Sequence, residues 1–105
     1  MTFRIKISIL ILFKNILESN LTVWKALGDE HYFEQLLSNS HIWVEIKNGK
    51  VVFHYKFVEE TAFEVTLFDL SRNLFVKLDS FHAYSTYNLS EKYAIISQGS
   101  WIKIS

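Results

Sequence analysis

The sequence HIWVEIKNGKVVFHYKF, residues 41–57, predicts a β-hairpin. Asn48-Gly49 joins two runs in which apolar and polar residues alternate. This pair suits a two-residue type I′ turn because both residues tolerate a positive φ. Such a turn fixes the pairing of the strands, placing Lys47 opposite Lys50 and Trp43 opposite His54.

Side-chain alternation divides this hairpin into two faces. The predicted inner face is apolar: Ile42, Val44, Ile46, Val51, Phe53, Tyr55 and Phe57. The predicted outer face is polar and basic: His41, Trp43, Glu45, Lys47, Lys50, Val52, His54 and Lys56. A slip of one residue would exchange the faces, so we expect the core to fix the register.

Composition bounds the class of protein. A chain of 105 residues forms one domain, and a sequence that is 50% hydrophobic and 16% aromatic can fill a core. Cysteine is absent, which excludes disulfides, thiol catalysis and cysteine metal sites. The formal net charge is zero, so we expect no binding of duplex nucleic acid.

Residues 1–20 form a hydrophobic segment with more than one interpretation. Alternating apolar residues from Phe3 to Phe13 predict a strand of the fold. Arg4 and Lys6 ahead of an apolar run predict instead a secretory signal or anchor. Helical spacing from Phe13 onward and an unattached end are further alternatives. The globular domain is therefore assigned to residues 21–105.

This segment bears on location and assembly. Lys14, Asn15 and Glu18 interrupt it, so we expect no transmembrane span. The absence of cysteine slightly favours an intracellular protein, whereas a signal at residues 1–20 would make it secreted. An unpaired strand here would promote a homodimer by edge pairing. Asn20 and Asn88 match the short N-glycosylation pattern, which also occurs by chance.

A helix is predicted near residues 29–38. Asp29 suits the N-cap, and Phe33, Leu36 and Leu37 form an apolar stripe at helical spacing. The acidic and histidine residues at its start raise the question of a metal site. No third ligand is evident, so we expect an ordinary capped first turn and no metal or cofactor.

The remainder of the chain predicts short strands separated by turns. Strands are expected at 63–68, 74–78, 82–87, 93–97 and 101–104, with turns at 69–73 and 98–100. The fold class is mainly β: an antiparallel meander, small barrel or sandwich of six or seven strands plus the 29–38 helix. An α+β or trefoil-like arrangement is the alternative.

The candidate binding residues are aromatic or lie on the basic hairpin face: Trp43, His54, Lys56, Glu45, Tyr84 and Trp101. An exposed Trp43 would provide a platform for a sugar ring, a base or a partner side chain. The alternative is that another element covers this tryptophan.

Signals for catalysis are weak. No nucleophile elbow, phosphate loop or HExxH motif is present. His54 and Glu45, both on the predicted outer face, form the best acid–base pair, but two solvated surface residues are the favoured explanation. The sequence therefore favours a protein without enzyme activity, leaves that activity undecided, and assigns no catalytic residues.

Two functional hypotheses follow. The first is a non-catalytic binding or interaction module for a protein or glycan, acting through the hairpin face. The second is a small-ligand carrier or small enzyme with an apolar pocket between helix and sheet.

Overall fold

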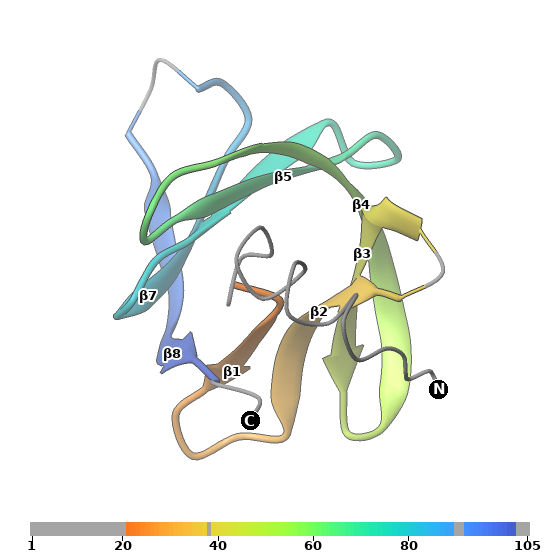
Figure 1. Ribbon diagram of the computed structural model, residues 1–105. Coiled ribbons are helices and arrows are strands. Elements are labelled where there is room, and N and C mark those ends of the chain that lie inside the picture. Colours follow the sequence, from red (N-terminus) through yellow and green to blue (C-terminus); the bar gives the residue numbers. More distant parts are fainter. Residues whose placement is uncertain (1–20, 38, 90–91, 103–105) are drawn as a thin grey trace.

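The computed structural model describes residues 21–37, 39–89 and 92–102. Eight antiparallel strands follow one another around the molecule (Figure 1). The strands are β1 (Val23–Ala26), β2 (His31–Leu36), β3 (Asn39–Lys47), β4 (Lys50–Glu60), β5 (Val65–Asp69), β6 (Leu74–Leu78), β7 (His82–Thr86) and β8 (Ala94–Trp101).

The sheet closes on itself, because β8 pairs with β1 through Trp24–Trp101 and Ala26–Gly99. The predicted mainly β, antiparallel class is confirmed, and the structure is a closed barrel of eight strands rather than six or seven. The α+β and trefoil-like alternatives do not describe this meander, since the described residues form no helix. Each of these strands is paired on both sides, which leaves no free edge among them.

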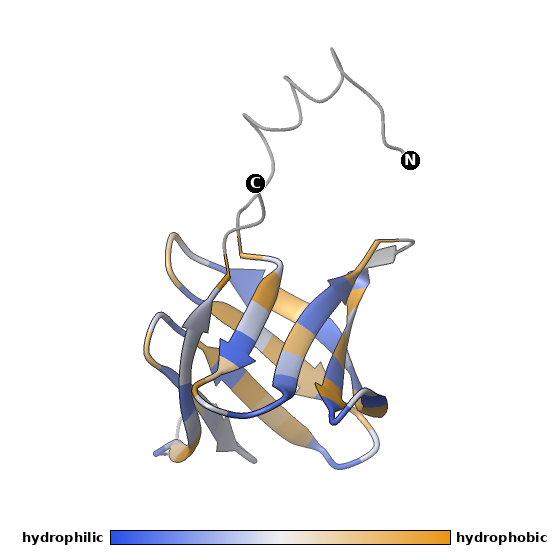
Figure 2. Ribbon diagram, turned by 90° about the horizontal axis from the view of Figure 1, so that it is seen from below, coloured by the Kyte–Doolittle hydropathy of each residue, from blue (hydrophilic) through white to orange (hydrophobic). Residues whose placement is uncertain are grey.

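The interior of the barrel is mostly apolar. Hydrophobic and hydrophilic residues alternate along the strands (Figure 2), as expected when one face is buried. An eight-stranded barrel is just wide enough for its side chains to fill. The buried core cluster is Trp24, Ala26, Phe33, Trp43, Tyr55, Val65, Leu67, Leu74, Val76, Leu78 and Ala83.

The hairpin has the predicted turn but different faces. Asn48 and Gly49 have φ of 51° and 80°, and Lys47 pairs with Lys50. A β-bulge then inserts Val52, so Glu45 pairs with Phe53 and Trp43 with Tyr55. The extra residue reverses the orientation of β3 relative to the prediction.

The predicted faces of β3 are therefore wrong. Trp43 and Glu45 are directed into the barrel, with exposed fractions of 1% and 5%. Ile42 and Ile46 lie on the opposite side of the strand and are partly exposed, whereas Val44 between them is buried, with an exposed fraction of 3%. On β4 the prediction is confirmed for Tyr55, which belongs to the core, and for Phe53 and Phe57, which pack against it, but it is wrong for Val51, which is 52% exposed.

The predicted helix at 29–38 is a strand. Gly28, with φ of 77°, lies in the turn that ends β1, and the chain returns as β2. His31 and Phe33 are buried with period two, and β2 pairs with both β1 and β3. Leu37, part of the predicted helical stripe, is fully exposed. Pairing with two neighbours outweighs the local spacing that favoured a helix.

The predicted turn at 98–100 lies inside β8, which runs without a break from Ala94 to Trp101. A Cβ on Gly99 would lie 2.3 Å from the Lys25 carbonyl oxygen and 2.5 Å from the Trp24 ring. Gly99 is thus a point of close approach within a strand, not a turn residue.

Residues 1–20 lie outside the described part of the chain, as do Asn20 and its glycosylation pattern. Asn88 is described and lies after the end of β7. Nowhere in the described residues is there a helix long and apolar enough to cross a bilayer.

Candidate functional site

The structure gathers polar side chains from four consecutive strands and the next turn inside the barrel. His31 of β2, Glu45 of β3 and Tyr55 of β4 are all buried. The His31 Nε2 atom lies 2.7 Å from Glu45 Oε2, and the Tyr55 hydroxyl donates to Glu45 Oε1 at 2.6 Å. A buried carboxylate requires such partners, because burying it unpaired costs several kcal/mol or more.

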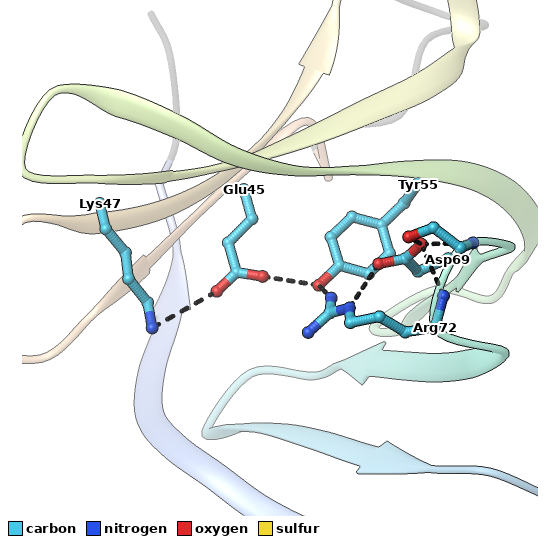
Figure 3. Close-up of polar contacts among 6 residues, drawn as sticks. Glu45, Lys47, Tyr55, Asp69 and Arg72 are labelled. Carbon is cyan, nitrogen blue, oxygen red and sulfur yellow. Dashed lines mark hydrogen bonds and ion pairs between the residues drawn. The ribbon is translucent and has the colours of Figure 1, made fainter.

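Arg72 and Asp69 extend this hydrogen-bond network to the β5–β6 turn (Figure 3). Arg72 donates from Nη2 to the Tyr55 hydroxyl at 2.7 Å and from Nε to Asp69 Oδ2. Its guanidinium also lies 3.3 Å from the centre of the Phe53 ring. Asp69 Oδ1 accepts from the backbone and hydroxyl of Ser71. This predicted turn is confirmed.

The pKa values follow from these contacts. Burial would raise the pKa of the Glu45 carboxyl, but hydrogen bonds from His31 and Tyr55 and the charge of Lys47 lower it overall. The same balance, with Ser71 and Arg72 as partners, lowers the pKa of Asp69. Burial and the Glu45 carboxylate raise the pKa of the Tyr55 phenol. At neutral pH this hydrogen-bond network therefore contains two ionised carboxylates, Glu45 and Asp69, and the neutral phenol of Tyr55.

The carboxylates of this buried network have hydrogen-bond partners. All four oxygens of Glu45 and Asp69 already accept hydrogen bonds. A network in which every member has a partner rigidifies a core. We therefore assign it a role in holding β2 to β6 together.

The sequence-predicted site residues are dispersed by the fold. His54 and Lys56 are exposed on the outer side of β4, whereas Glu45 is inside, so the predicted His54–Glu45 acid–base pair does not form. Trp43 is a core residue that packs edge-on against Trp101, with ring centres 6.3 Å apart. Trp101 is partly buried against the core, and its indole N–H donates to the Phe63 carbonyl at 3.0 Å, so neither tryptophan is a fully exposed platform.

A groove of about 630 Å³ runs over the outside of β7, β8 and β1, which lie side by side in Figure 1. This volume falls within the range of small-molecule sites. Leu27 and Phe81 on its walls are 74% and 71% exposed. The side chains most relevant to binding are Lys25, Leu27, Phe81, His82, Gln98 and Ser100.

A core tryptophan supports the wall that carries Phe81 and His82. The Trp24 indole N–H donates to the Asp79 carbonyl at 2.8 Å. The Asp79 carboxylate in turn accepts from the backbone N–H groups of Phe81 and His82 at 2.8 and 2.7 Å. The Phe81 carbonyl accepts from Gly99 N–H at 2.9 Å, which ties the turn to β8. The exposed Phe81 ring thus stands on a well-anchored backbone.

An aromatic surface continues from this groove along β7. The Tyr84 ring lies 5.4 Å from the His82 ring and 6.3 Å from the Tyr93 ring. Lys77 Nζ lies 4.8 Å above the Tyr93 ring and 3.7 Å from Glu64. Burial and the negative charges of Asp79 and Glu64 raise the pKa of Tyr84, whose hydroxyl stays protonated at neutral pH.

Of the predicted site residues, Tyr84 contacts the groove residue His82, and Trp101 lies in the chain between the groove residues Ser100 and Ile102. Leu27, Phe81, His82 and Gln98 were not selected from the sequence. The sequence predicts a turn at Asp79-Ser80. The signal for it is the aspartate, whose side chain can accept hydrogen bonds from the backbone N–H groups that follow. That the next phenylalanine is exposed follows only from the tertiary structure.

The second functional hypothesis placed a pocket between a helix and the sheet, and the described residues contain no helix to form it. Those residues also hold no cluster of three or more side chains suited to a metal ion. The chain matches no known family model, no curated protein and no solved structure.

Proposed function

We propose that this protein is a non-catalytic binding module that holds an uncharged carbohydrate in the groove over β7, β8 and β1. The observation that carries this proposal is an exposed aromatic ring, Phe81, beside neutral hydrogen-bonding side chains. The face of an aromatic ring is negatively polarised and attracts the C–H groups of a sugar ring. Gln98 and Ser100 would then bond the sugar's hydroxyl groups.

The charge in the groove favours a neutral ligand. Among the described residues that line it, Lys25 carries the one permanent charge. Its ammonium already donates to the backbone carbonyls of Asp29 and Ala26, at 2.9 and 3.2 Å. A phosphate or carboxylate would have one lysine in the groove to bind, and it would compete with these two carbonyls for that ammonium.

The backbone argues against a peptide that binds as an added strand. β8, under the groove, is already paired with β7 on one side and β1 on the other. Adding a strand requires an unpaired edge. Recognition must therefore come from side chains, which suits a ring-shaped ligand with many hydroxyl groups.

The test is a titration of the ¹⁵N-labelled full chain with maltotriose, cellotriose and triacetylchitotriose, followed through backbone amide shifts. We expect one of these sugars to shift the amides around Phe81 and Gln98. Phe81→Ala should weaken binding about tenfold, in line with the loss of a central aromatic contact.

The matched control is Phe63→Ala, because Phe63 is 69% exposed and does not line the groove. This variant should bind the same sugar within about twofold of the wild type. The proposal is wrong if Phe81→Ala and Phe63→Ala behave alike. Groove shifts caused by peptides and by none of the sugars would also overturn it and assign a protein partner.

A further inference from the structure

The groove and the aromatic surface along β7 are physically continuous. His82 lines the groove, and its Nδ1 atom lies 3.2 Å from the Tyr84 hydroxyl. Ala83 between them is fully buried, so His82 and Tyr84 lie on the outer face of the same strand. A ligand that leaves the groove along β7 therefore reaches Tyr84 next.

Two aromatic platforms are available along this path, and their spacing exceeds one sugar ring. Phe81 and Tyr84 are three residues apart, which corresponds to about 10 Å of extended chain. A single pyranose on Phe81 leaves Tyr84 uncovered. A linear chain of two or three rings would cover both.

The far end of the path is equally suited to an uncharged ligand. Lys77 and Glu64 lie 3.7 Å apart beside the Tyr84–Tyr93 pair, and their opposite charges offset each other. Both side chains retain hydrogen-bonding capacity for hydroxyl groups. The pattern of the groove, an aromatic face beside polar side chains, is thus repeated there.

From this arrangement we infer that the site recognises an oligosaccharide chain, with Tyr84 as a second platform beyond Phe81. This inference rests on the proposed carbohydrate binding in the groove. Tyr84 would extend the contact, and Phe81 would be required for ligands of every length.

The test compares ligands of one to four rings, using the glucose, maltose, maltotriose and maltotetraose series and the matching cello- and chito-oligosaccharides. Affinity is measured by calorimetry on the full chain. We expect it to rise about tenfold between one and three rings and then to level off. Tyr84→Ala should remove this rise, whereas Tyr84→Phe, which keeps the ring, should preserve most of it.

Tyr87→Ala is the matched control, because Tyr87 is 70% exposed and lies beyond the end of β7. This variant should keep the dependence on length. The inference is overturned if wild-type affinity does not depend on length while Phe81→Ala still weakens binding, and the proposed function then stands. Absence of binding to every sugar overturns both.

Discussion

Tyr55→Phe tests whether the buried polar chain stabilises the barrel. The substitution removes one hydroxyl and keeps the ring. That hydroxyl donates to Glu45 at 2.6 Å and accepts from Arg72 at 2.7 Å, in a side chain that belongs to the buried core. Its removal leaves a buried carboxylate oxygen without its donor, and the closed barrel gives water little access to replace it.

The magnitude follows from the two partners. A hydrogen bond to a charged group contributes roughly 1.5–3 kcal/mol, and the two bonds of one hydroxyl are not additive. We expect Tyr55→Phe to lower the free energy of unfolding by about 2–4 kcal/mol. A domain of this size has roughly 5–15 kcal/mol in total, so the melting temperature should fall by on the order of 10 °C or more.

The assay is urea unfolding followed by tryptophan fluorescence, since Trp24 and Trp43 are both in the core. Tyr87→Phe, at an exposed position, is the control and should change stability by less than about 0.5 kcal/mol. A double-mutant cycle with Glu45→Gln should give a coupling energy of about 1 kcal/mol or more. The stabilising role of the buried network would be refuted if Tyr55→Phe were as stable as the control and showed no coupling energy with Glu45→Gln.

Two further predictions concern stability. Gly99→Ala places a methyl group 2.5 Å from the Trp24 ring and should lower the free energy of unfolding in urea by roughly 1–3 kcal/mol. Ser100→Ala, at the next residue, is the control and should be nearly neutral. Equal effects of the two substitutions would contradict the close contact between Gly99 and Trp24. The pKa values of Glu45 and Asp69 are lowered in the folded state, so their stabilisation is complete above about pH 5 and is lost as pH falls through the folded values. The raised pKa of Tyr55 has the opposite consequence, with stability lost as pH rises above about 10. Unfolding free energies measured across pH should show both losses, and Glu45→Gln and Tyr55→Phe should reduce the acid and alkaline loss, respectively; unchanged profiles would contradict this.

Some features of the fold were determined by short stretches of sequence. Asn48-Gly49 specifies its own turn, because few other pairs adopt two positive φ values. Leu74, Val76 and Leu78 are buried as their alternation predicts, since all three residues on this side of β6 are aliphatic and the other side carries Lys77. In such segments the local preference and the tertiary environment agree.

The faces of β3 could not be determined in this way. Residues 42–46 carry large apolar side chains on both sides, so hydrophobicity does not choose between Trp43 and its neighbours. The bulge at Val52 decides, and no residue type marks that position. Glu45 is tolerated inside because His31 and Tyr55 arrive from other strands to bond it.

The candidate site shows the same division. The sequence by itself determined that the chain is a small, antiparallel β domain with an excess of aromatic residues and no recognisable catalytic motif. It offered Tyr84 and Trp43 among the candidate binding residues without deciding which of these rings is exposed. Only the tertiary structure decided which aromatic rings face solvent, because that depends on barrel closure, on one bulge and on the Trp24–Asp79 contact that supports the turn bearing Phe81. These are long-range constraints, and neighbouring residues alone do not encode them.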